Sequence, residues 1–154
     1  MITTAFTLRP YQAADEDAAI ELWRRTWQLA YPDLDFTARL DWWRARWRSE
    51  LVGTATITLA ESAASTGQLV GFVTVDPKTL YLDQIVVAPE AWGSRIADAL
   101  LAEAKRLSPA GLDLAVNADN GRAIRFYEKQ GFVVTGTDVN ERSGAPIRKM
   151  AWRP

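Results

Sequence analysis

Apolar and polar positions along the chain follow two repeats, one typical of helices and the other of strands. Residues 6–10 are expected to form a short strand, and a helix follows within residues 13–32. Asp15 is a candidate N-cap for this helix, acidic residues follow at its positive end, and Pro32 ends it. The chain is therefore expected to begin with a strand that leads into a helix.

A second helix is expected over residues 36–51, because its apolar residues recur every three or four positions. These residues are Leu40, Trp43, Trp47 and Leu51. Trp42 falls on the opposite, polar side of the same helix. The pattern therefore predicts a buried stripe with one tryptophan outside it.

Three runs rich in β-branched residues follow, separated by turn-forming stretches, and they predict an antiparallel meander. The runs are residues 54–60, 68–75 and 80–87. The elements expected after them are a helix over 94–107, a strand over 112–116, a short helix within 117–131, and strands over 132–140 and 147–152.

This order of elements predicts an α/β fold, which some schemes class as α+β. The strand-helix-strand units of the second half imply local parallel pairing within a mostly antiparallel sheet. We expect about six or seven strands, with helices on both faces of the sheet. No linker or internal repeat interrupts the chain, so residues 1–154 are expected to form a single domain.

The composition is that of an ordinary globular protein, with 48% hydrophobic and 24% charged residues. Lys and Arg number 18 against 19 Asp and Glu, so no global field favours nucleic acid or an anionic membrane as a partner. The first ten residues lack a signal-peptide pattern, and no stretch approaches the ~18 apolar residues of a membrane span. We therefore expect a cytoplasmic protein.

Cysteine and histidine are both absent from the sequence. Their absence excludes disulfides, cysteine nucleophiles, Ser-His-Asp triads and metal sites built on thiolate or imidazole ligands. We expect no metal, and any chemistry must use carboxylates, Tyr, Lys, Arg, hydroxyl groups or the backbone.

Two stretches carry a family resemblance: "IVVAPEAWGSRIADALL" at residues 85–101 and "VNADNGRAIRFYEKQGF" at residues 116–132. Together they resemble the GNAT superfamily of acyl-CoA-dependent N-acetyltransferases, and the order of elements is similar over essentially the whole chain. The second stretch is the more specific one. Its matching residues are Asn120, Ala123, Phe126, Tyr127, Gly131 and Phe132.

The first stretch departs from the family pattern, which runs Gln or Arg, two variable residues, Gly, one variable residue, then Gly or Ala. The six positions here are Trp92, Gly93, Ser94, Arg95, Ile96 and Ala97, and only the last matches. A helix start can still hold a pyrophosphate, because the donors are backbone N–H groups. Arg95 therefore either swings aside or pairs with a phosphate, or else it obstructs the loop.

The resemblance also implies where the coenzyme, acetyl-CoA, would bind. Backbone groups of Ile85, Val86 and Val87 would hold the thioester carbonyl and the pantetheine arm. Further coenzyme contacts are expected on the second motif, at Asn120, Ala123, Phe126 and Tyr127. Asn120 could instead only cap its helix, and the three strand residues could serve only as core.

Acyl transfer to an amine needs a neutral nucleophile, and an ammonium of pKa near 10.4 is neutral in roughly one molecule in a few thousand at pH 7. Asp83 is the candidate general base, with Gln84 able to orient a water. The alternative is that Asp83 is a solvated or ion-paired strand residue. By resemblance, Tyr127 would protonate the departing thiolate; otherwise it is a packing residue.

Seven tryptophans are a high count for this length, and most lie in the first two helices. Trp23, Trp27, Trp43 and Trp47 are expected in the core. In the family this region forms the acceptor wall, so the candidates for substrate contact are Trp27, Tyr31, Trp42 and Asp83. Trp42 could equally meet a second subunit, which makes a homodimer possible.

The second helix is also locally basic, through Arg39, Arg44, Arg46 and Arg48. These residues either form a solvated face or attract an acceptor that carries a carboxylate. A nucleic-acid role for this helix has no support from the overall charge.

The sequence thus predicts an N-acetyltransferase that moves the acetyl group of acetyl-CoA to a primary amine by direct attack in a ternary complex. A small molecule or an amino acid is the favoured acceptor over a protein. The alternative is a coenzyme-binding sensor or interaction module that keeps the fold without turnover.

Overall fold

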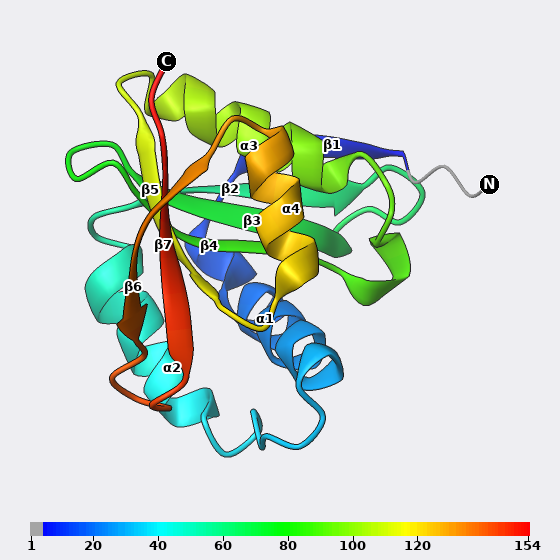
Figure 1. The fold of residues 1–154 in the computed structure, drawn as a ribbon. Coiled ribbons are helices and arrows are strands. Elements are labelled where there is room, and N and C mark those ends of the chain that lie inside the picture. The colour runs from blue at the N-terminus through cyan, green and yellow to red at the C-terminus, as the bar shows by residue number, and fades with distance from the viewer. Residues whose placement is uncertain (1–4) are drawn as a thin grey trace.

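The computed structural model of the protein describes residues 5–154, so the part of the expected domain that falls on residues 1–4 lies outside the described residues. The strands of this part form one sheet in the order β1-β2-β3-β4-β5-β7-β6 (Figure 1). The strands are β1 (Phe6–Pro10), β2 (Thr56–Ser62), β3 (Leu69–Asp76), β4 (Tyr81–Val87), β5 (Leu112–Asn117), β6 (Val133–Val139) and β7 (Pro146–Trp152). The α-helices are α1 (Glu16–Ala30), α2 (Leu40–Arg46), α3 (Ile96–Leu107) and α4 (Gly121–Lys129).

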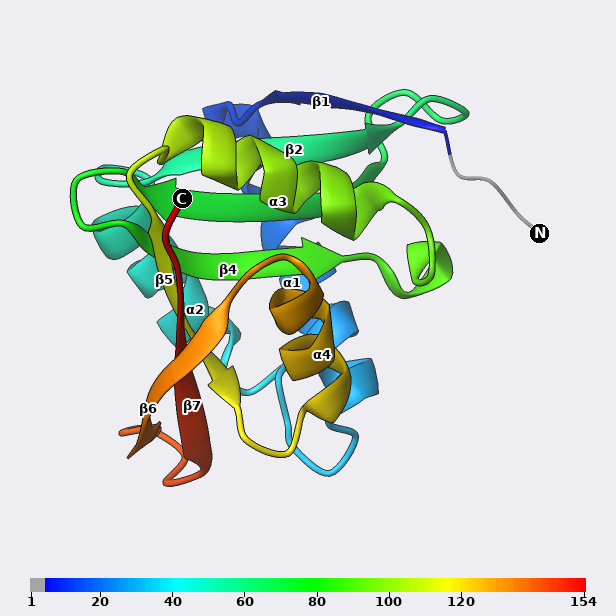
Figure 2. The same ribbon diagram turned by 45° about the horizontal axis from the view of Figure 1, so that its top comes forward.

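The sheet is mixed, as the sequence predicts: β4 and β5 are parallel, and all other neighbouring strands are antiparallel. Helices α3 and α4 cover one face, and α1 and α2 lie behind the sheet on the other (Figure 2). This confirms the expected α/β class with helices on both faces. Over residues 5–154, no helix combines the length and the apolar character needed to cross a bilayer.

The sheet opens between its two parallel strands. Tyr81 of β4 faces Asp113 of β5, and no further residues of these two strands are paired within the described chain. Beyond this point the strands diverge toward their carboxyl ends (Figure 2). The part of β4 that follows Tyr81, residues 82–87, therefore has a strand neighbour only on its β3 side.

The core beneath α1 and α2 is built from stacked aromatic rings. Trp43 and Trp47 are fully buried, and Trp23 stacks on Trp43 with ring centroids 4.5 Å apart. The Trp47 indole N–H donates to the Tyr11 hydroxyl at 3.1 Å. These contacts confirm three of the four tryptophans expected in the core, whereas Trp27 is only half-buried.

The second helix is shorter than predicted and changes its winding. It begins at Leu40 rather than near residue 36, and residues 47–51 form a π-helical turn in which Val52 donates to the Trp47 carbonyl. Residues four apart on an α-helix drift by about 40° around its axis. The wider turn offsets this drift and keeps both Trp47 and Leu51 in the core.

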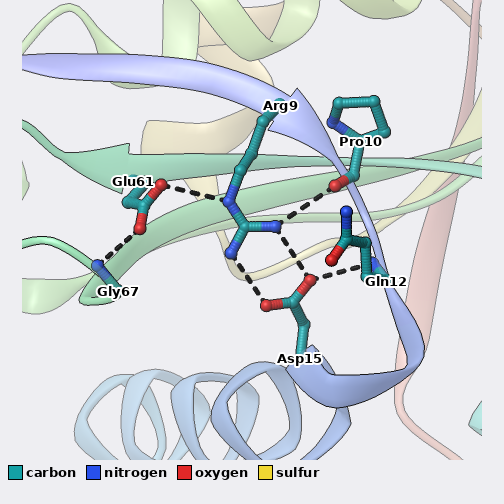
Figure 3. A network of polar contacts seen from close by, with 6 residues as sticks. All are labelled: Arg9, Pro10, Gln12, Asp15, Glu61 and Gly67. Atoms are coloured by element: carbon teal, nitrogen blue, oxygen red, sulfur yellow. Dashed lines mark hydrogen bonds and ion pairs between the residues drawn. The ribbon is translucent and has the colours of Figure 1, made fainter.

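Asp15 lies at the N-cap position of α1, as the sequence predicts, but its side chain makes no capping hydrogen bond to the helix. Its carboxylate instead accepts two bonds from Arg9, at 2.9 and 2.8 Å, and one from the backbone N–H of Gln12 at 2.8 Å (Figure 3). Arg9 also donates to Glu61 at 3.1 Å. A charged partner on β1 therefore outcompetes the local cap, because charge-assisted bonds are the stronger ones.

The basic residues of the second helix are mostly paired rather than free. Arg44 and Arg48 donate to Glu16 at the start of α1, at distances of 2.7 to 2.8 Å. Arg46 reaches Asp83 on β4 and also Glu50. The arginines therefore connect the helix to α1 and to the sheet, which differs from the solvated face that the charge pattern allowed.

The pairing of Glu16 predicts a pH dependence of stability. Hydrogen bonds from Arg48, with a smaller contribution from Arg44, lower the pKa of Glu16 from 4.5 to about 2. A carboxylate with a depressed folded pKa stabilises the fold above its unfolded pKa, and this contribution is lost as pH falls through the folded value.

At pH 7, the free energy of unfolding measured in urea should therefore be lower for Glu16→Gln than for the wild-type protein. This difference in free energy should shrink as the pH falls from 4.5 to about 2. Asp17→Asn, which removes a carboxylate that is largely exposed, serves as the matched control and should show a smaller difference. A difference that stays constant down to pH 2 would contradict this role of Glu16.

Candidate functional site

The diverging part of β4 presents backbone donors away from β3. Asp83 has no partner in the β3 register and forms a bulge between the paired residues Leu82 and Gln84. After the bulge, the Ala88 N–H donates to Val70 of the β3 strand at 2.8 Å. Because backbone groups alternate along a strand, Val86 faces β3 as well, and Ile85 and Val87 turn their N–H groups toward the opening beside β5.

The loop after β4 places an indole over this opening. The Trp92 ring is 41% exposed, and its N–H donates to the Val87 carbonyl at 2.8 Å. The Arg122 guanidinium, on the first turn of α4, lies 5.9 Å from the centroid of the same ring. Trp92 therefore lies between the end of β4 and the start of α4, where the family pattern has Gln or Arg.

The start of α3 needs positive φ at one residue only. Gly93 has φ +81°, a conformation that side chains rarely adopt, whereas Arg95 has φ −86° at the helix N-cap. Arg95 is exposed, and its guanidinium makes no hydrogen bond or ion pair with residues 5–154. Its backbone is thus compatible with an open helix start, and its charge is available to an anion.

The remaining positions of the first motif contribute mainly backbone. Ser94 is half-buried and accepts a bond from the Ile96 N–H at 3.3 Å. The Ile96 side chain is fully buried in the core, and Ala97 is half-buried. Only their backbone groups at the helix start could therefore contact a phosphate.

The second motif forms α4, and its cap agrees with the prediction. The Asn120 side-chain oxygen accepts a bond from the Ala123 N–H at 3.1 Å. Tyr127 is buried, with its ring centroid 5.4 Å from that of Phe126 and 5.5 Å from that of Phe132. Burial raises the pKa of Tyr127, so the phenol stays protonated at neutral pH. Its hydroxyl makes no hydrogen bond to the described residues.

Asp83 is not free to act as a base in this geometry. Arg46 donates to both of its carboxylate oxygens, one of them at 2.9 Å, and the Gln84 side chain donates to Oδ1 at 3.0 Å. Only 12% of the Asp83 side chain is exposed. Both carboxylate oxygens are therefore already occupied by donors from Arg46 and Gln84. The structure thus favours the alternative interpretation, in which Asp83 is an ion-paired strand residue.

The carboxyl end of α1 meets the loop after β5 through a polar contact that the sequence did not reveal. Tyr31 stacks on Trp27, with ring centroids 5.7 Å apart and an angle of 17° between the ring planes. Its hydroxyl donates to Asp119 at 3.1 Å and accepts from the Asn117 side chain at 2.9 Å. Asn117 and Asp119 lie inside the second motif, but their partner is 86 and 88 residues away in sequence.

Trp42 is 38% exposed, as its position on the polar side of the second helix predicts. The Arg142 guanidinium, from the turn between β6 and β7, lies 3.8 Å from the centroid of its ring. This cation–π contact joins α2 to the last hairpin, so part of the ring surface is covered by the protein itself.

The predicted residues thus gather in two groups on either side of the sheet opening. The loop at residues 92–97 and α4, with Tyr127, lie on the face that carries α3, and Trp27, Tyr31, Trp42 and Asp83 lie toward α1 and α2 (Figures 1 and 2). Within residues 5–154, no cluster of three or more carboxylates is placed to hold a metal ion.

The sequence matches a known protein family and individual relatives. The model of the acetyltransferase (GNAT) family matches residues 16–132. The peptidyl-lysine N-acetyltransferase YjaB of Salmonella typhimurium is 36% identical over 66 residues, which span 43% of this chain and 45% of that protein. The chain therefore covers less than half the length of this relative. The peptidyl-lysine N-acetyltransferase YiaC of Escherichia coli is 28% identical over 94% of this chain and 95% of its own length.

A solved structure shows the same fold. The PaiA N-acetyltransferase of Thermoplasma acidophilum, determined in complex with coenzyme A, superposes with a TM-score of 0.76 at 21% identity over 97% of this chain and 99% of that one. Because the family model covers more than half of the sequence, the chain belongs to the GNAT acetyltransferase family.

Proposed function

We propose that the protein transfers the acetyl group of acetyl-CoA to a primary amine. The observation that carries this proposal is the opening between β4 and β5, where strand alternation turns the N–H groups of Ile85 and Val87 away from β3. Strand amides without a strand partner can donate to a thioester carbonyl and to the oxyanion that forms from it. Such preorganised donors are worth about 3 kcal/mol of barrier each.

The coenzyme would lie along the face that carries α3 and α4. Its pyrophosphate is proposed to meet the backbone of residues 93–97, where Gly93 opens the loop and the helix dipole favours an anion. The guanidinium of Arg95 is available to pair with a phosphate oxygen. Asn120, Ala123 and Phe126 would line the pantetheine arm along α4.

The chemistry is proposed as direct attack of the amine on the thioester, because the sequence has no cysteine to carry an acyl intermediate. The Ile85 and Val87 amides would stabilise the oxyanion, and the buried, protonated Tyr127 would give its proton to the departing thiolate. Asp83, held by Arg46, would fix the bulge that precedes the amide donors. Water or another side chain would then act as the general base in place of Asp83.

The acceptor is proposed to be an alkyl amine that approaches from the α1 and α2 side, past Trp27, Tyr31 and Trp42. A free amino acid or other small amine was favoured by the sequence, and a lysine side chain is suggested by the names of the YjaB and YiaC relatives. A cytoplasmic location and a homodimer through the exposed part of Trp42 belong to the same proposal.

A thiol-release assay with acetyl-CoA tests the function, using lysine, a lysine-containing peptide and a panel of small amines. Calorimetry with acetyl-CoA runs in parallel. Binding with amine-dependent release of thiol supports the enzyme, and binding without release on any amine supports the sensor alternative. No binding of the coenzyme at all would overturn both.

Arg95→Gly tests the proposed pyrophosphate contact. If the guanidinium pairs with a phosphate, the Kd for acetyl-CoA should rise about tenfold, which corresponds to the loss of one charge-assisted bond. Isothermal titration calorimetry measures this change, and Arg106→Gly, on the last turn of α3, is the matched control. Tighter binding by Arg95→Gly would show that the side chain obstructs the loop.

A further inference from the structure

The contact between Tyr31, Asn117 and Asp119 lies across the sheet opening from Tyr127. Asn117 ends β5, and its side chain reaches toward α1, where it donates to the Tyr31 hydroxyl at 2.9 Å. Tyr127 belongs to α4, which covers the opposite face (Figure 2). A thioester placed in the opening would therefore have the two tyrosines on opposite sides.

Measured along the two parallel strands, the contact is also level with the proposed amide donors. Asn117 follows Asp113 by as many residues as Ile85 follows Tyr81, and Tyr81 and Asp113 are the paired residues of the two parallel strands. Since parallel strands rise equally per residue, Asn117 is level with Ile85 or, because of the bulge at Asp83, with Val86. By this register, the partner of the Tyr31 hydroxyl on β5 is level with the part of the opening where acyl transfer is proposed.

The hydrogen bonds of Tyr31 leave one position of its oxygen unused. A phenol oxygen has one proton to donate and can accept two bonds. The proton goes to Asp119 at 3.1 Å, and one acceptor position is taken by Asn117. The second acceptor position has no partner among the described residues. The orientation is fixed, because Asn117 can only donate through its nitrogen and an ionised Asp119 can only accept.

We propose that Tyr31 binds the acceptor ammonium through this acceptor position and passes one of its protons to Asp119. This inference rests on the proposed function, which does not assign the general base, and it assigns that role to Tyr31 together with Asp119. One N–H bond of the ammonium breaks as its proton moves to the Tyr31 oxygen, while the Tyr31 proton moves to Asp119. The freed nitrogen lone pair forms the bond to the thioester carbon.

The protons balance over the reaction. An ammonium that becomes an amide loses two protons in all. One leaves through Tyr31 to Asp119 and then to water, since Asp119 is exposed. The other replaces the proton that Tyr127 gives to the departing thiolate.

The same site sets the class of acceptor. Trp27 stacks on Tyr31, so the two half-buried rings form one aromatic unit beside the hydroxyl's partners. A flat apolar wall next to a carboxylate suits a cation on an alkyl chain, because the chain can pack on the rings while the charge faces Asp119. The site is therefore built for an alkylammonium such as the lysine side chain, and it disfavours acceptors with a carboxylate next to the amine.

Asp119→Asn tests the proposal, with Asp33→Asn as the matched control. Asp33 is an exposed aspartate two residues after Tyr31, so both variants remove one negative charge from the same region. With a lysine-containing peptide at pH 7, Asp119→Asn should lower kcat/KM about a hundredfold, at the lower end of what general acid–base catalysis contributes. Asp33→Asn should change it less than twofold, and the Kd for acetyl-CoA should be unchanged in both.

The pH profile separates a proton acceptor from a structural role. The defect of Asp119→Asn should narrow as pH rises from 7 toward 10, because a larger fraction of the amine is then already neutral. Tyr31→Phe should show the same narrowing. A defect that is constant with pH, or equal activity of Asp119→Asn and Asp33→Asn, would overturn the proposal. If the wild-type protein releases no thiol with any amine, the proposed function fails, and this inference fails with it.

Discussion

Replacing Tyr127 with phenylalanine is expected to lower kcat about a hundredfold, at the lower end of what a positioned proton donor contributes. The reason is the role proposed for the phenol: burial raises the pKa of Tyr127, so the hydroxyl keeps its proton at neutral pH and would be able to donate it to the thiolate. Phenylalanine keeps the ring contacts with Phe126 and Phe132 and removes only the hydroxyl. Because that hydroxyl makes no hydrogen bond to the described residues, the stability of the fold should change little.

Steady-state thiol release measures this prediction, and thermal unfolding with and without acetyl-CoA confirms that fold and coenzyme binding persist. Tyr81→Phe, at the start of β4, removes the same atom from a tyrosine outside the site and should keep full activity. An unchanged kcat in Tyr127→Phe would show that the thiolate leaves without this donor.

Gly71→Ala should destabilise the protein by about 1–3 kcal/mol, the usual cost of an extra methyl group in a tight core. An added Cβ would lie 2.9 Å from the Val86 carbonyl oxygen, 3.0 Å from Leu100 Cδ1 and 3.1 Å from Ile96 Cγ2. The side-chain atoms can move, but the carbonyl belongs to the backbone of β4. Both the strand that carries the amide donors and the start of α3 would therefore shift.

Urea unfolding gives the stability change, and calorimetry should show weaker binding of acetyl-CoA in the same variant. Gly136→Ala is the matched control, because a Cβ at that strand position meets no atom within 4 Å. If Gly71→Ala binds the coenzyme as tightly as the wild-type protein, the packing of α3 on β3 does not position the phosphate loop.

Much of the fold could be read from local patterns. The helical spacing of Trp43 and Trp47, the β-branched runs of the meander, and Asn120 at the start of α4 all appear in the structure where the sequence predicts them. In each case the signal and the structure that it specifies lie within a few residues of each other. The remaining elements follow in the order that the local patterns predict.

The polar contacts of acidic side chains could not be read in this way, because their partners lie on other elements that the tertiary fold brings near. Asp83 has the type and position of a base, yet Arg46, on another helix, donates to its carboxylate. Asp15 is an acidic residue at a helix N-cap, yet its carboxylate accepts a hydrogen bond from Arg9 on β1. In both cases an arginine brought near by the tertiary fold decides the role of an acidic residue.

The single pairing between β4 and β5 also has a mechanical consequence. The sheet consists of two panels, β1 to β4 and β5 with β7 and β6, joined at a bridge where the Asp113 N–H donates to Leu80 at 2.7 Å. A small rotation of one panel about that bridge would displace the carboxyl ends of β4 and β5 the most. Side-chain contacts such as those of Tyr31 with Asn117 and of Trp42 with Arg142 also connect the two panels, and a pantetheine arm lying in the gap would add a further link between them.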